Sequence, residues 1–254
     1  MRRFLFTLCA AFLISPVGLF GSTAHAETAP MNCTFENDFA RLDKVKSNPS
    51  ADYLANVRAE LAVRKDILRK IVACGAEEVK LLKAKVAGAS TTDSGAQDIK
   101  KQLTARLDEA LERYATSESR IDTLGLRGSQ ELSRSLKDWR MTNYSQLSEL
   151  ALNFLVWEKN KSLFKTARIR FEEIGKAVNS LKFADTEDIR KLFDEAKTDL
   201  EHAESLHRDV EQKLKTLDSP ESTFAIIKES LEALSKTYQK FFDLSQMVQK
   251  VVPR

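Results

Sequence analysis

The sequence predicts an all-α fold, an elongated antiparallel helical bundle or coiled coil with about five long helices and one short N-terminal helix. Glycine and proline are scarce, at 8 and 5 of 254 residues, and 30% of the chain is charged, which is typical of long helices. Apolar residues recur at spacings of three and four along most of the chain. A seven-residue repeat also runs through its middle, which favours a supercoiled seam: Leu136, Asn143, Leu150, Trp157, Phe164, Phe171 and Val178.

Residues 1–26 have the three parts of a secretory signal peptide. Arg2 and Arg3 precede an apolar run from Phe4 to Phe20, and Ala24-His25-Ala26 forms a small-x-small cleavage site. An uncleaved anchor is the alternative, but helix-breaking residues interrupt the apolar run. We therefore expect a periplasmic or secreted protein, exported by general secretion, whose mature chain begins at Glu27.

The charge of the mature chain points to no anionic partner. Removal of the two signal-peptide arginines lowers the count of Lys and Arg from 40 to 38, against 37 Asp and Glu. Such a balance gives no basis for expecting nucleic acid as a partner. No later apolar run approaches the ~18 residues that a membrane-spanning helix needs, so we expect no membrane span after cleavage.

Cys33 and Cys74 are the two cysteines left after cleavage, and we expect them to form a disulfide. An even pair in an oxidising compartment usually does so. A redox-active pair or an intermolecular bridge are the alternatives, although the close C-x-x-C spacing of redox sites is absent. Gly75, next to Cys74, is interpreted as room for the N-terminal segment to approach the helix.

Three helical segments follow the signal peptide. Residues 27–51 hold the short helix and a turn, pinned by the disulfide, and residues 52–124 form a helical hairpin around the loop "AGASTTDSGA". Ser94 and Gln97 match a capping box at the start of the second helix of this hairpin. Residues 129–252 form a long-helix coiled-coil bundle, which begins with one helix over 129–182.

The last two helices of this bundle are expected to be antiparallel neighbours. The connection between them, "LDSPE", is short, with Ser219 as the cap and Pro220 at the first helical position. These two helices can pack along only part of the 129–182 helix. The remainder of that helix must contact the hairpin or a second subunit.

The sequence shows no catalytic, metal-binding or cofactor-binding constellation. His202 and His207 are both expected on one helix, five residues apart and rotated by about 140°, so one metal ion does not readily take both. Glu204-x-x-His207 matches half of a di-iron motif, but no second half exists. We interpret both histidines as solvated, and we predict a protein that is not an enzyme and needs no cofactor or metal.

Two clusters are candidate binding features, each with a structural alternative. A basic run is either an anion-binding patch or a solvated helix flank paired with acids; it comprises Lys159, Lys161, Lys165, Arg168 and Arg170. An aromatic line is either a ligand pocket or helix core; it comprises Trp139, Phe154, Trp157, Phe164 and Phe171.

From these patterns we expect an extracytoplasmic helical scaffold or protein-interaction module, whose partner is another envelope or secreted protein or a second copy of the chain. An extended helical seam presents a long binding surface. The first alternative is a bundle that binds an apolar or haem-like small ligand through the aromatic line. The second is an enzyme with dispersed carboxylates, for which no residue shows a visible cause of a tuned pKa.

Overall fold

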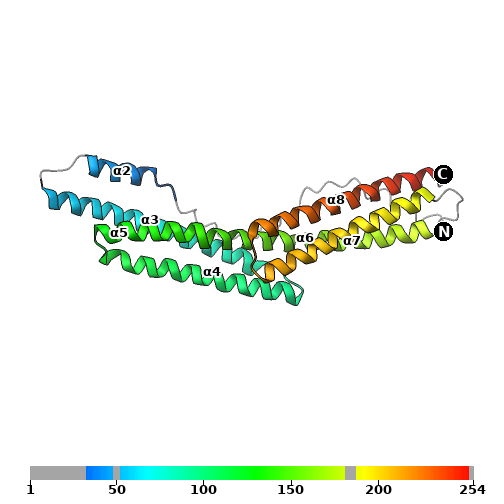
Figure 1. Cartoon of the computed structure of the whole chain (residues 1–254), viewed down its shortest axis with the longest axis horizontal. Coiled ribbons are helices and arrows are strands. Elements are labelled where there is room, and N and C mark those ends of the chain that lie inside the picture. The colour runs from blue at the N-terminus through cyan, green and yellow to red at the C-terminus, as the bar shows by residue number, and fades with distance from the viewer. Residues whose placement is uncertain (1–32, 48–51, 181–186, 252–254) are drawn as a thin grey trace. The chain divides into compact units, whose positions relative to one another are not determined.

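The computed structural model describes residues 33–47, 52–180 and 187–251, which are helical and contain no β-strand. This confirms the predicted all-α bundle of long helices (Figure 1). The predicted signal peptide and its cleavage site lie outside the described residues. The elements are α2 Glu36–Ser47, α3 Tyr53–Gly88, α4 Ser94–Arg120, η2 Ile121–Thr123, α5 Leu126–Trp139, η3 Arg140–Tyr144, α6 Ser145–Ser180, α7 Glu187–Lys215 and α8 Pro220–Val251.

Side-chain caps define where the helices begin. Asp52 accepts hydrogen bonds from the backbone N–H groups of Leu54 and Ala55 at the start of α3. Asp93 caps α4 by accepting from the N–H of Ala96 at 2.7 Å, so the cap lies one residue before the predicted Ser94. The carboxylate of Asp93 satisfies one of the free N–H groups of the first turn. The cap and first position of α8 are Ser219 and Pro220, as predicted.

The helix predicted over 129–182 is a run of three elements, α5, η3 and α6. It starts at Leu126, three residues earlier than predicted, and contains a π-helical turn at Arg140–Tyr144. A π turn inserts one extra residue into an α-helix. Within the turn, the inward-facing position therefore moves by one residue: Tyr144 is buried and Asn143 is exposed, which corrects the placement of Asn143 on the seam.

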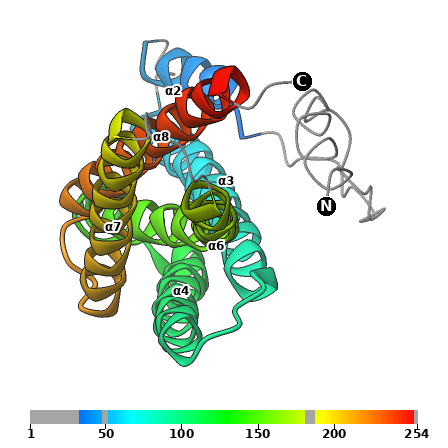
Figure 2. The same ribbon diagram turned by 90° about the vertical axis from the view of Figure 1, so that its right-hand side faces the viewer.

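Two hydrophobic clusters fill the bundle. In the first, α3, α4 and α5 pack together with the start of α6 and with the adjoining ends of α7 and α8. In the second, α7 and α8 form an antiparallel pair that packs on the second half of α6 (Figures 1 and 2). The helix α6 contributes to both clusters, so the predicted division of its contacts between the hairpin and the last two helices is confirmed.

Cys33 and Cys74 form a disulfide, with their Cα atoms 5.9 Å apart, and it fastens the segment that precedes α2 to the middle of α3. Apart from this bond, α2 is held by few contacts. Its only buried residue is Leu42, which packs with Val63 and Ile67 of α3 in a small separate cluster. Ion pairs from Arg41 and Asp38 to α3 add surface contacts.

Candidate functional site at the π-helical turn

The π-helical turn at Arg140–Tyr144 is the most unusual local structure in the long helical run. The N–H of Ser145 bonds to the carbonyl of Arg140, five residues back, in place of the α-helical partner. Thr142 and Asn143 are weak helix formers, because a branched or short polar side chain competes with the helical backbone. Rare π turns of this kind occur frequently at functional sites, which directs attention to the surface around this one.

A pocket of about 260 Å³ opens beside the turn. Its apolar surface comes from α4, from α5 and η3, from the start of α6 and from Leu217, two residues after the end of α7. Polar side chains of α4, η3 and α6 stand at its edge. The lining comprises Arg106, Glu109, Ala110, Trp139, Thr142, Asn143, Tyr144, Gln146, Leu147, Leu150 and Leu217.

Leu217 has a left-handed backbone with φ of 49°, the only non-glycine residue with positive φ among those described. It ends α7, where its N–H bonds to the carbonyl of Leu214 and the N–H of Asp218 bonds to that of Lys213. This pairing is a Schellman motif, whose left-handed position is usually glycine. A leucine there costs roughly 1–2 kcal/mol of backbone strain. Here its side chain packs on the core and lines the pocket.

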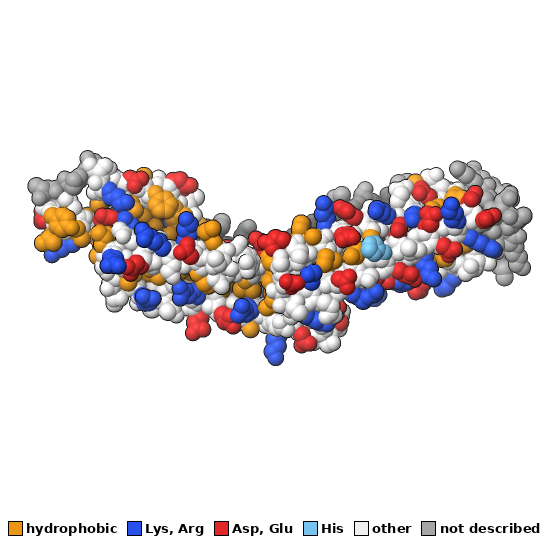
Figure 3. All heavy atoms as spheres, viewed as in Figure 1, with side chains coloured by type: hydrophobic (Ala, Val, Ile, Leu, Met, Phe, Trp, Pro, Cys, Tyr) orange, Lys and Arg blue, Asp and Glu red, His pale blue; other side chains and the backbone are white. Residues whose placement is uncertain are grey.

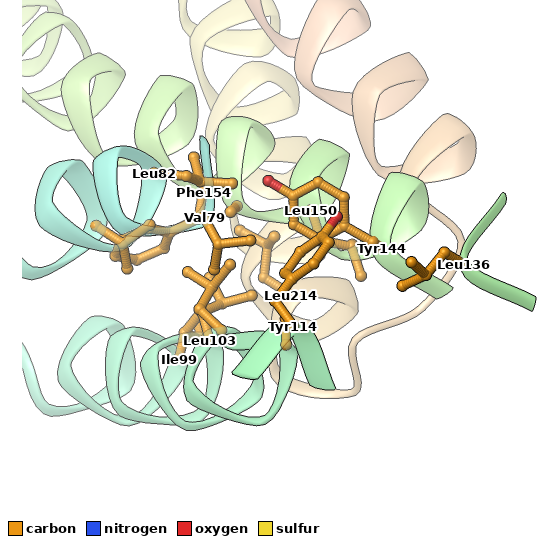
Figure 4. Close-up of a cluster of buried hydrophobic side chains, with 14 of the residues drawn as sticks. Val79, Leu82, Ile99, Leu103, Tyr114, Leu136, Tyr144, Leu150, Phe154 and Leu214 are labelled. Atoms are coloured by element: carbon orange, nitrogen blue, oxygen red, sulfur yellow. The ribbon is translucent and has the colours of Figure 1, made fainter. Parts of the chain in front are cut away.

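Next to the pocket, a polar network joins α3, α4 and the π turn through the partly exposed side chain of Arg140. The guanidinium donates to the carboxylate of Glu78 on α3 at 2.8 Å, and also to the hydroxyl of Tyr114 on α4. It lies 5.1 Å from the ring centre of Tyr144. Trp139 contacts both tyrosine rings, one edge-on and one stacked. These contacts fix the π turn against α3 and α4. Figure 4 shows Tyr114 and Tyr144 among the buried side chains of the first hydrophobic cluster.

Burial controls the ionisation of this network. Burial raises the pKa of Tyr114, and the adjacent Arg140 charge offsets this only in part. Burial and then the negative charge of Glu78 raise the pKa of Tyr144 far above its ordinary range. Both hydroxyls therefore stay neutral. Across the described chain, the Tyr144 hydroxyl is among the few buried polar atoms with no hydrogen-bond partner.

The predicted aromatic line divides between core and pocket. Phe154, Trp157, Phe164 and Phe171 are buried and pack against protein groups, and Phe171 stacks on Phe193 with centroids 4.5 Å apart. Trp139 alone of the five lines the pocket. The structure therefore favours the core interpretation for four of these rings.

His207 lies between two of these rings and is not the solvated residue that we predicted. Its ring stacks on Trp157 and contacts Phe164, with centroids 5.4 and 4.3 Å away, and its Nε2 is buried without a partner. Burial, followed by the charge of Lys161, lowers the pKa of His207 to about 4. The sequence did not reveal this, because the pattern places position 207 at the edge of the apolar stripe of α7.

The five residues of the predicted basic patch do not form one cationic surface. Lys161 pairs with Asp93 and Glu158, each at 2.6 Å, and lies 3.9 Å from the ring centre of Trp157. Arg168 forms a bidentate ion pair with Glu204, donating from two guanidinium nitrogens to the two carboxylate oxygens. Arg170 lies over the ring of Tyr238, while Lys159 and Lys165 are exposed. Basic and acidic side chains alternate across the visible face in Figure 3.

Both residues of the Glu204-x-x-His207 motif have structural contacts. Glu204 is occupied by Arg168, and His207 is packed between aromatic rings. In the described ranges, no group of three or more His, Cys, Asp or Glu side chains is arranged to hold a metal ion. No helix in those ranges is long and apolar enough to cross a membrane.

Comparisons with family models, with curated proteins and with solved structures found no significant match to this chain. Sequence reasoning missed Tyr144, Gln146 and Leu217 as pocket residues. The sequence contains one indication of the π turn. Polar Asn143 occupies a position of the seven-residue repeat and aromatic Tyr144 follows it, which is the pattern expected where an inserted residue moves the buried position by one.

Proposed function

We propose that this chain is an exported extracytoplasmic protein-interaction module without catalytic activity. The observation that carries the proposal is a row of exposed apolar side chains on α6, formed by Leu152, Val156 and Leu163 and called here the α6 stripe. These side chains are 50%, 40% and 46% exposed. At roughly 100° per residue they lie within an arc of about 40°.

The α6 stripe faces away from the buried side of the helix. Phe154 and Trp157, rotated from it by roughly 180° and 120°, fill the first cluster, and the stripe residues belong to neither cluster. An exposed apolar row that belongs to neither hydrophobic cluster is a frequent mark of a docking surface. Apolar side chains four and eleven residues apart on one helix match the spacing by which helical surfaces bind protein partners.

Export is supported by the signal-peptide pattern and by the disulfide. Cys33 and Cys74 are paired in the structure, and structural disulfides persist mainly in oxidising compartments. The partner we propose is accordingly another envelope or secreted protein. Self-association through the stripe is the second arrangement that the experiment below distinguishes.

The absence of catalytic activity is supported by how the ionisable groups are used. The strongly perturbed groups, Tyr144 and His207, are packed into the core with their polar atoms covered. The acids that act on their pKa values are themselves paired with basic side chains: Glu78 with Arg140, Asp93 with Lys161 and Glu211 with Lys215. Perturbed groups in such an arrangement stabilise structure and offer no proton to an outside substrate.

Site-specific photo-crosslinking in the exporting cell tests the proposal. A photo-reactive amino acid is placed at Leu163 or, as a matched control, at Ile169, which lies on the same helix outside the stripe and is 47% exposed. We expect a discrete protein adduct from position 163, absent from position 169 and lost when Leu152→Glu is added. Equal labelling at both positions, or no adduct, contradicts the proposal. An adduct at twice the chain mass identifies self-association.

A further inference from the structure

Two rare backbone conformations meet at one pocket. The π turn supplies Thr142, Asn143 and Tyr144, and the left-handed residue after α7 supplies Leu217. Strained or irregular backbone persists only where surrounding structure holds it, and it concentrates at binding sites. These two features are more than 70 positions apart in the sequence, and each places side chains in the lining of the same cavity.

The pocket has an apolar floor. Ala110, Leu150 and Tyr144 are buried, while Trp139, Leu147 and Leu217 are half-buried around them. At about 260 Å³ the cavity is smaller than the ~300–1,000 Å³ of typical small-molecule sites. Its size and lining suit one large aliphatic or aromatic side chain, the kind of anchor that dominates protein interfaces.

The rim carries groups that match a peptide backbone. Asn143 and Gln146 are exposed side-chain amides, and each has both donor and acceptor atoms, as a peptide group has. The side-chain oxygen of Asn143 lies 2.8 Å from the hydroxyl of Thr142, whose single hydrogen it shares with the backbone carbonyl of Asp138. The side-chain N–H donors of Asn143 are left for a ligand. The charged rim residues Arg106 and Glu109 neutralise each other at 3.0 Å, so the rim does not select an anion.

We propose that this pocket anchors one large apolar side chain of an extended peptide segment in a partner protein. The amides of Asn143 and Gln146 bond to the peptide groups beside that anchor. This inference deepens the proposed function and rests on it, but it concerns a different face from the α6 stripe. Crosslinking at Leu163 therefore tests the function, and peptide binding at the pocket tests this inference.

The two tryptophans make the test direct. Trp139 lines the pocket, whereas Trp157 is buried in the core, so their indole N–H signals in nuclear magnetic resonance spectra report separately. The Trp157→Phe variant keeps only the indole N–H signal of Trp139 and so assigns both signals. The probes are acetyl-Gly-Ser-Leu-Ser-Gly-amide, the same peptide with glycine at its centre, and 3-methylbutanol, which has the apolar group of leucine without peptide bonds.

We expect the leucine peptide to shift the Trp139 signal with saturation in the millimolar range, and the glycine peptide to bind at least tenfold more weakly. Asn143→Ala combined with Gln146→Ala removes two hydrogen bonds of ~0.5–1.5 kcal/mol each, a loss of about tenfold in peptide affinity. This pair of substitutions leaves 3-methylbutanol binding unchanged. Asn179→Ala, an exposed amide on α6 outside the pocket, is the matched control.

Leu217→Gly separates binding from folding. Glycine suits the left-handed position, so the variant keeps the chain folded while it removes part of the pocket floor. We expect weaker leucine-peptide binding with the thermal midpoint preserved. An unshifted Trp139 signal up to the solubility limit of the peptide overturns the inference. So does 3-methylbutanol binding as tight as that of the peptide.

Discussion

At the residue scale, a single glycine sets the distance between α3 and α4. A Cβ atom on Gly75 would lie 2.4 Å from a ring carbon of Tyr114, too close for any real contact. The sequence interpretation of Gly75 as room for the N-terminal segment is therefore wrong. Gly75 makes room for the buried ring of Tyr114, whose hydroxyl accepts a hydrogen bond from Arg140. The neighbouring residue Cys74 forms the disulfide with Cys33.

Gly75→Ala therefore tests the Tyr114 contact. We expect a loss of about 1–3 kcal/mol in the free energy of unfolding, because an added methyl overpacks the contact. Gly88→Ala is the control, since no atom lies within 4 Å of its added Cβ, and we expect it to change stability little. Urea unfolding of both variants makes the comparison. Equal stability of the two would show that Tyr114 does not pack against Gly75.

His207 makes stability depend on pH. Its folded pKa, about 4, lies below the ordinary 6.5, so the unfolded chain binds this proton more readily between those values. Stability is then full above about pH 6.5 and falls as the pH drops toward 4, by an amount on the order of 2 kcal/mol after solvent screening. Lys161 and Arg208 act with burial, while Glu211 and Asp93 oppose it.

The measurement is urea unfolding of His207→Phe at several pH values between 4 and 7. We expect the free energy of unfolding of the variant to depend less steeply on pH in this window, by the contribution of up to one bound proton. His202→Gln, which removes an exposed histidine on the same helix, should keep the wild-type slope. Parallel pH profiles for wild type and His207→Phe would rule out the buried environment assigned to this ring.

At the element scale, the sequence predicts the helices well and their irregularities poorly. Apolar periodicity places α3 to α8 within a few residues, because each of these helices buries a stripe over many turns. The π turn at Arg140–Tyr144 was not predicted, because one inserted residue leaves the seven-residue spacing intact on both sides. Leu217 was missed because its strain depends on the Schellman end of α7 and on packing that only the fold brings together.

The helix α2 depends on its disulfide more than on its packing. Only Leu42 is buried, whereas closure of a loop with a sequence separation of 41 contributes up to about 4 kcal/mol. In the Cys33→Ser, Cys74→Ser variant we expect faster amide hydrogen exchange across Glu36–Ser47, with exchange in α7 and α8 unchanged. Protection of α2 equal to that of the wild type would mean that its surface contacts suffice.

At the scale of the whole molecule, α6 links the two hydrophobic clusters. Trp157 belongs to the first cluster and Phe164 to the second, one heptad apart on the same continuous helix. His207 of α7 contacts both rings and so joins the clusters directly. This arrangement uses one face of α6 for the core and leaves the α6 stripe exposed.

Phe164→Asp tests which face of α6 is internal. It places an uncompensated charge in the second cluster, and we expect a loss of at least about 3 kcal/mol, seen as a thermal midpoint lower by roughly 6 °C or more. Leu163→Asp, one residue away and exposed, should leave the midpoint nearly unchanged. A reversed order of the two midpoints would mean that the opposite face of the helix is buried.

The central claim, an exported module that binds a protein through the α6 stripe, is tested most directly by native mass spectrometry of the protein purified from cells that export it. We expect a chain beginning at Glu27 in a defined complex with another protein or with a second copy of itself. That complex should disappear in the Leu152→Glu, Leu163→Glu variant and persist in Ile169→Glu. A monomer carrying a stoichiometric small molecule, unaffected by the stripe substitutions, would contradict the claim.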